Sequence, residues 1–328
     1  MLASSVPCRG GAEVISLLGL TPSSYRPHDL HGEERTFPET NCYTDLWIEI
    51  VHARGLDPVA MLAFCTVVDF EGDQWTFFKP PPADLEALYG MEIGELQVYR
   101  PLHLHVLEQL GLGRLVTFEV DGHFLPDTAG RSYRLTHEKT SVAVEALDVD
   151  GERLRYFHNG GFFELSGEDF RSAFRLGPLQ AGDLPPYVEF IRMDRLPACP
   201  AEELRRTASA LLERQLALRP RTNPVRRFGD RLVGDMPGLG SQEAYHDYAF
   251  ATLRQCGAAW AAAASFLHWL DSDRHGRAAA SFEALAGSSK QLLFKLARSA
   301  ASGRTFDPAG LIDPMVTAWD SALDALSP

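Results

Sequence analysis

The sequence predicts an α+β protein in which helices precede an antiparallel sheet and a helical domain completes the chain. Three observations lead to this class. Apolar residues recur at helical spacing between residues 42 and 110, and their period changes to two between residues 115 and 165. After Pro200 the strand signals vanish. The predicted boundaries are residues 1–195 for the α+β domain and 196–328 for the helical domain.

The helical elements come first. Residues 42–69 are typical of two helices broken at Gly55-Leu-Asp-Pro58, because proline is favoured in the first turn of a helix. The aromatic run Trp75 to Phe78 indicates a short strand. Two further helices are predicted at 82–89 and 102–110.

Four strands are then expected from the period-two pattern, at residues 115–120, 141–147, 154–157 and 162–165. Asp148-Val-Asp-Gly151 is a turn signal that joins the second and third of them into a hairpin. The later helices are predicted at 202–218, 242–270, 277–302 and 308–326, with residues 219–240 as an irregular connection.

Charge and composition narrow the functional classes. The formal net charge of the 328 residues is −13, which argues against nucleic acid as a partner because nonspecific binding to DNA or RNA needs a basic face. The longest apolar segment, 249–270, contains Arg254 and His268, so it suits a packed helix better than a membrane span. The N-terminus lacks the pattern of a secretory signal.

The cysteines are odd in number, scattered and without a C-x-x-C pair: Cys8, Cys42, Cys65, Cys199 and Cys256. Such a set favours neither a disulfide framework nor a zinc site, and it points to the reducing cytoplasm. His103-Leu-His105 invites a metal interpretation. On a helix, residues i and i+2 point about 200° apart, so we expect no metal there.

Cys42 is the first candidate catalytic residue. It stands where a polar stretch meets an amphipathic helix, and a helix N-terminus favours the thiolate form of a cysteine. His137, just before a predicted strand, is the candidate base, and Asn159, just after another strand, would orient the imidazole. Cysteine, histidine and asparagine in this order are typical of papain-like enzymes, so the predicted fold is papain-like, with the cysteine on a helical lobe beside a sheet lobe.

Other residues complete the candidate site. The oxyanion donors would be the Cys42 backbone N–H and a side chain such as Asn41 or Gln74. His158 is either an alternative catalytic histidine or an ordinary strand residue packed beside Tyr156. Cys42 itself has a plain alternative, since free cysteine is often a small core residue.

Four segments carry a resemblance to the family named domain of unknown function 1839. They begin at Asn41-Cys-Tyr-Thr-Asp-Leu-Trp, Asp69-Phe-Glu-Gly-Asp-Gln-Trp, Glu119-Val-Asp-Gly-His-Phe-Leu-Pro and Tyr156-Phe-His-Asn-Gly-Gly-Phe-Phe. The match extends from Asn41 through Phe170. The family name carries no chemistry.

A more distant resemblance is to the family of butirosin biosynthesis protein H, which has a papain-like N-terminal domain. It rests on an early cysteine, the Val-Asp-x-x-x-Leu-Pro strand end, and a histidine followed by two strands. The resemblance implies transfer of an aminoacyl group from a carrier-protein thioester to an amine, with Cys42 as nucleophile, His137 as base and Asp121 at the strand end. Where those relatives have an aspartate after the last strand, this chain has His158-Asn159.

The expected partner is therefore an acyl or aminoacyl carrier protein, whose phosphopantetheine arm is substrate rather than bound cofactor, and whose supplier would be a synthetase-like amino acid ligase. An arginine-rich segment that includes Arg226 and Arg227 is the expected docking surface for an acidic carrier. A cysteine peptidase or amidase, and a non-catalytic partner of a biosynthetic system, remain open alternatives.

Overall fold

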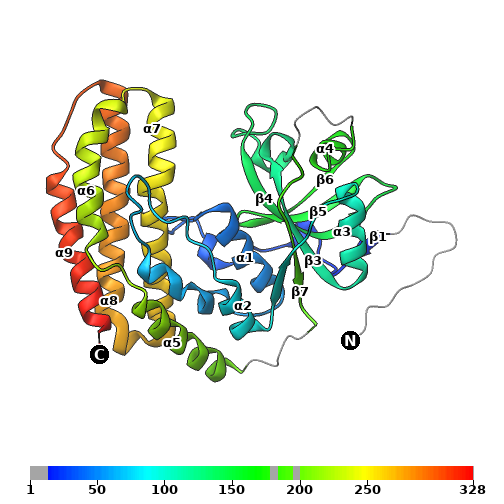
Figure 1. Cartoon of the computed structure of the whole chain (residues 1–328), viewed down its shortest axis with the longest axis horizontal. Coiled ribbons are helices and arrows are strands. Elements are labelled where there is room, and N and C mark those ends of the chain that lie inside the picture. Colours follow the sequence, from blue (N-terminus) through cyan, green and yellow to red (C-terminus); the bar gives the residue numbers. More distant parts are fainter. Residues whose placement is uncertain (1–13, 178–183, 195–199, 328) are drawn as a thin grey trace. The chain divides into compact units, whose positions relative to one another are not determined.

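The computed structural model describes residues 14–177, 184–194 and 200–327, and its contacts divide the chain into two compact units (Figure 1). One unit comprises Met1–Asp29, Cys42–Leu56 and Leu85–Ala198, and the other comprises Leu30–Asn41, Asp57–Asp84 and Cys199–Pro328. The chain passes between the units repeatedly. The helical lobe predicted from residues 42–69 is consequently not a separate body.

The first unit is built on one antiparallel sheet, in which the strands run β2-β7-β3-β4-β5-β6 and β1 also pairs with β4. The strands are β1 (Val14–Ser16), β2 (Glu92–Glu95), β3 (Arg114–Asp121), β4 (Lys139–Asp148), β5 (Arg153–His158), β6 (Gly161–Ser166) and β7 (Val188–Arg192). The four strands predicted from the period-two pattern are confirmed as β3 to β6.

Helices cover both faces of this sheet. Tyr43 of α1 (Cys42–Ala53) bonds Glu189 of β7, and Thr117 of β3 bonds the same carboxylate. The next residue, Phe118, packs instead on Phe174, directly after α4 (Glu168–Ala173). Because successive strand residues point to opposite faces, α1 and α4 lie on opposite sides of the sheet.

The face of α4 also carries α3 (Leu102–Gly111), and the two helices close a hydrophobic core over Val116, Phe118 and Val142. Short 3₁₀ turns connect the elements of this unit: η1 (Pro22–Ser24), η4 (Gly122–Phe124) and η5 (Pro126–Thr128). The predicted helices at 82–89 and 102–110 are confirmed as α2 (Pro82–Tyr89) and α3.

The second unit is helical. Its long helix α8 (Gln255–Ser302) packs against α9 (Ala309–Leu326) and the 3₁₀ segment η3 (Pro58–Val67). The remaining elements are η2 (Asp29–His31), α5 (Ala201–Ala217), α6 (Pro224–Asp235), η6 (Met236–Gly238), α7 (Gln242–Ala249) and the π-helical turn η7 (Phe250–Arg254). The break predicted between 270 and 277 takes the form of one non-helical residue, Asp271, inside α8.

Two predictions for this unit are wrong. Residues 75–78 form no strand, since Trp75 makes only an isolated bridge with Phe70 and packs on Trp260 in the helical core. Residues 219–240 are not irregular, because they contain α6. Among the described residues, no helix is long and apolar enough to cross a membrane.

Candidate functional site

Cys42 is the first residue of α1, and its thiol reaches the start of β4. The sulfur hydrogen-bonds with the Thr140 side chain and the Ser141 backbone, and it lies within the electrostatic reach of Lys139. Pairing between β4 and β5 begins only at Ala143, so β4 extends past its neighbour at this point. The thiol is partly exposed.

Burial raises the pKa of the Cys42 thiol, and the nearby Asp45 carboxylate raises it further. Hydrogen bonding with Thr140 and Ser141 and the charge of Lys139 oppose this rise without cancelling it. The resting thiol is therefore protonated at neutral pH, and the helix N-terminus alone does not ionise it. A nucleophilic role for this sulfur requires a base.

The imidazole connected to the thiol is that of His158. Thr140 Oγ1 lies 2.8 Å from His158 Nε2, and His158 Nδ1 lies 2.5 Å from Asp127 Oδ2. Because a carboxylate can only accept, Nδ1 carries a proton, and in the neutral ring Nε2 then accepts the proton of the Thr140 hydroxyl. One hydrogen-bonded chain thus runs from Cys42 through Thr140 and His158 to Asp127.

Both carboxylate oxygens of Asp127 accept hydrogen bonds. The Tyr156 hydroxyl donates to its second oxygen at 2.5 Å, and burial followed by the Asp127 charge raises the pKa of Tyr156. Only 2% of the His158 side chain and 5% of the Asp127 side chain are exposed. The ring therefore has a fixed orientation and a fixed tautomer, which is the arrangement that a catalytic histidine needs.

His137 has a different environment. Its Nδ1 lies 2.6 Å from Asp121 Oδ2, its ring stacks on His123 with centroids 4.4 Å apart, and 73% of its side chain is exposed. Partial burial raises the pKa of Asp121, but the hydrogen bonds from His137 and from two backbone N–H groups outweigh it and lower that pKa. No contact between His137 and Cys42 occurs among the described interactions.

Asn159 opens the two-residue turn between His158 and Gly161, with φ of +46°. Asparagine tolerates this left-handed conformation better than most residues. Within the part of the chain that the structure describes, its amide makes no hydrogen bond to either histidine. The structure thus does not bring Asn159 and His137 together, and the carboxylate of Asp127 orients His158.

The two candidate oxyanion side chains belong to the helical unit. The Asn41 amide donates to the Phe78 carbonyl at 2.9 Å, and Gln74 is an exposed turn residue whose carbonyl accepts from the Glu71 N–H. The backbone N–H groups in the first turn of α1 add positive potential at the thiol.

The two arginines of the expected docking surface differ. Arg227 is engaged internally, because its guanidinium bonds Asp69 and the Phe70 carbonyl. Arg226 is exposed on α6, and the described residues include no acidic partner for it. A free basic surface at this position therefore depends on Arg226.

The histidines considered for metal binding are separated by the helix. His105 is buried and accepts from the Tyr99 N–H, whereas His103 faces a different environment beside Phe174. Across residues 14–177, 184–194 and 200–327, no group of three or more His, Cys, Asp or Glu side chains is arranged around a common metal position.

Sequence reasoning missed Thr140, Asp127 and Tyr156. A signal for Tyr156 existed, since Tyr156 and His158 are two residues apart on one strand and therefore share a face. The positions of Thr140 and Asp127 depend on strand register. Thr140 pairs with Val120 of β3, and the chain after β3 leads to the 3₁₀ turn η5, which contains Asp127.

Comparisons with known proteins identify the family. The DUF1839 N-terminal domain matches residues 26–193, and the DUF1839 C-terminal domain matches residues 201–328. No curated protein matches the chain. The two matched regions together cover most of the sequence, so the chain belongs to the DUF1839 family.

Proposed function

We propose that the protein is a cysteine-dependent acyltransferase that moves an acyl or aminoacyl group from a carrier-protein thioester to an amine. The observation that carries the proposal is the hydrogen-bonded chain from Cys42 through Thr140 and His158 to Asp127. A thiol suits this reaction, because attack on a thioester forms a second thioester of similar energy.

The first half-reaction follows from the donors and acceptors. The Cys42 proton passes to Thr140 Oγ1 while the Thr140 proton passes to His158 Nε2, leaving a thiolate and an imidazolium. The sulfur then bonds the acyl carbon, the carrier's carbon–sulfur bond breaks, and the imidazolium proton goes to the departing pantetheine thiolate. Lys139 and the α1 N-terminus stabilise the negative charge along this path.

The second half-reaction uses the same groups. An amine bonds the acyl carbon, the bond to Cys42 breaks, and the amine proton reaches the thiolate through His158 and Thr140. The net change converts a thioester and an amine into an amide and a thiol. If water replaces the amine, the same steps hydrolyse the thioester or an amide.

A papain-like fold is the finer form of this proposal. It is supported by a helix that starts at the cysteine and packs on an antiparallel sheet, and by a histidine held by a carboxylate on that sheet. A nucleophilic thiol must also stay reduced, so we propose the cytoplasm as the site of action.

The experiment is to incubate the protein with an aminoacyl carrier protein, with and without added amine, and to map acyl adducts by peptide mass spectrometry. We expect an adduct on Cys42 that disappears when amide forms. Cys42→Ala should abolish it, whereas Cys65→Ala, which removes an equally free but buried thiol, should retain it.

The outcomes separate the functions. Acid formed without amine would establish hydrolysis instead of transfer. Absence of any adduct, with each of several aminoacyl carriers, would end the enzymatic proposal and leave a non-catalytic partner protein.

The carrier itself is proposed to dock through exposed basic residues such as Arg226, because carrier proteins are acidic. Arg226→Glu should slow association in a salt-dependent manner. Arg227→Glu is a poor test, since it also breaks the contact with Asp69.

A further inference from the structure

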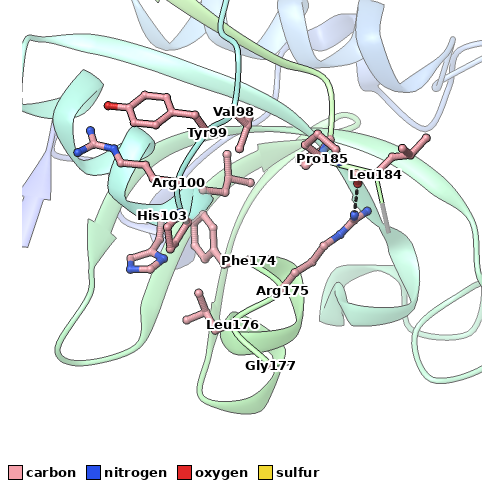
Figure 2. A pocket seen from close by; sticks show the side chains of 13 residues that line it. Val98, Tyr99, Arg100, His103, Phe174, Arg175, Leu176, Gly177, Leu184 and Pro185 are labelled. Atoms are coloured by element: carbon pink, nitrogen blue, oxygen red, sulfur yellow. Dashed lines mark hydrogen bonds between the residues drawn. The ribbon is translucent and has the colours of Figure 1, made fainter. Parts of the chain in front are cut away.

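A pocket of about 710 Å³ lies on the α3 and α4 face of the sheet unit, apart from the residues of the thiol chain. Its walls come from the segment before α3, the first residues of α3, the residues that follow α4 and the residues before β7. Figure 2 shows Arg100 and His103 on one side, Arg175 on the other and Phe174 between them.

The floor and rim of this pocket are mainly apolar. Phe174 packs on Phe118 and on the His103 ring, with centroids 5.5 and 6.2 Å apart. Tyr99 and Leu184 line the same pocket although each is 79% exposed. Large apolar side chains that gather around a cavity and face solvent are typical of a ligand site.

Arg175 has an unexpected backbone conformation. It lies two residues after Ala173, the last residue of α4, with φ of +52°, and the bonds Arg175 N to Ser172 O and Leu176 N to Arg171 O form a Schellman ending. Glycine is the favoured residue at this position because it has no Cβ penalty. An arginine there gives up backbone stability and places a guanidinium beside the pocket, where it bonds the Leu184 carbonyl at 2.6 Å.

The opposite wall supplies further polar groups. Arg100 Nε and His103 Nδ1 are buried and have no hydrogen-bond partner among the described residues. Another nitrogen of Arg100 pairs with Glu108 of α3, which anchors the guanidinium on that helix. The N-terminus of α3 adds positive potential, since its first residues also line the pocket.

We propose that this pocket binds a small organic anion, namely an apolar or aromatic body that carries a carboxylate or a phosphate. The body lies against Phe174 and the surrounding aliphatic side chains. The anionic group lies between Arg175 and the start of α3, where it satisfies Arg100 Nε.

The probes are isosteres that differ only in the charged group: 3-phenylpropanoate, 2-phenylethyl phosphate, neutral 3-phenylpropanamide and cationic 3-phenylpropylamine. Isothermal titration of the full chain should give dissociation constants of about 1 mM or below for at least one anion, in keeping with ligands of this size. The amide should bind about tenfold more weakly, and the amine weaker still. The two anions distinguish a carboxylate site from a phosphate site.

Arg175→Gly gives the sharper test, because the proposal predicts opposite effects on stability and binding. The glycine relieves the left-handed backbone, so the melting temperature should stay equal or rise, while preference for the anion over the amide is lost. Glu152→Gly is the matched control. Glu152 also has a positive φ, +47°, but it lies outside the pocket, so binding should be unchanged.

Arg175→Gln covers the case in which the glycine variant folds poorly, since it keeps a side chain and removes only the charge. It should also lose the anion preference. Equal binding of the acid, phosphate and amide to the wild type, no measurable binding of either anion, or unchanged anion preference in both Arg175 variants would overturn the proposal.

Discussion

The sheet unit contains two histidine–aspartate pairs that differ in burial and in hydrogen-bond partners. His158 and Asp127 are buried and bonded at both ends, to Thr140 and to Tyr156. His137 and Asp121 lie at the surface, where the ring stacks on His123. The difference between the pairs teaches that hydrogen bonding to the thiol, and not position before a strand, identifies the imidazole that we propose as its base.

The largest expected difference between the pairs is in acyl transfer. His158→Gln removes the base, so the rate of transfer from an aminoacyl carrier should fall by about 10²–10⁴. His137→Gln removes an exposed ring with no described contact to Cys42 and should change that rate by less than about threefold. Thermal unfolding of both variants checks that the loss at the buried position is not simple unfolding.

The aspartates extend the comparison. Asp127→Asn removes the acceptor that fixes the His158 tautomer, so transfer should fall on the order of 100-fold while Cys42 remains in place. The Tyr156 hydroxyl and the His158 Nδ1–H also lose a charged acceptor, so the unfolding free energy should drop by about 1–3 kcal/mol. Asp121→Asn is the matched variant, and an equal loss of transfer from it would contradict the distinction between the pairs.

Substitutions of Thr140 test whether its hydroxyl carries the proton between Cys42 and His158. Thr140→Val keeps the shape and removes the hydroxyl, so we expect about a tenfold slower transfer. Thr140→Ser keeps the hydroxyl and should retain most of the rate. If valine and serine variants transfer equally fast, then Thr140 only packs and the proton follows another path.

The smallest expected effect concerns acid stability. The pKa of Asp121 is lowered in the folded chain, so its stabilising contribution is complete above the unfolded value of about 4 and is lost as pH falls below that value. Asp121→Asn should therefore flatten the decline of unfolding free energy below about pH 4, by less than about 1 kcal/mol at this partly exposed site. Urea unfolding of the wild type and of Asp121→Asn at several acidic pH values measures this difference in unfolding free energy.

Strands β3 to β6 could be predicted because they carry regularly placed apolar residues, such as the alternating Val116, Phe118 and Val120 of β3. α6 was missed because residues 219–240, which contain Asn223-Pro224, were interpreted as an irregular connection. The structure uses the same two residues as a helix start, with the Asn223 side chain accepting from the N–H groups of Val225 and Arg226. β7 was missed because it is short and follows Pro185-Pro186.

The candidate site could be predicted only in part. Cys42 at a helix start follows from local pattern, since one polar-to-amphipathic transition marks it. The partners of Cys42 depend on strand register and on a turn near residue 127, and neither is encoded within a single window of sequence. The raised pKa of the thiol arises from burial by residues distant in sequence, so local reasoning favoured a thiolate instead.

The most direct test of the central claim is the pH dependence of Cys42 alkylation, which needs no substrate. Iodoacetamide labelling followed by peptide mass spectrometry isolates this sulfur from the other four cysteines. We predict that the wild-type rate rises between about pH 5 and 8, where an imidazole loses its proton, and that this rise persists in His137→Gln and disappears in His158→Gln. A rise that disappears in His137→Gln and persists in His158→Gln would contradict the account.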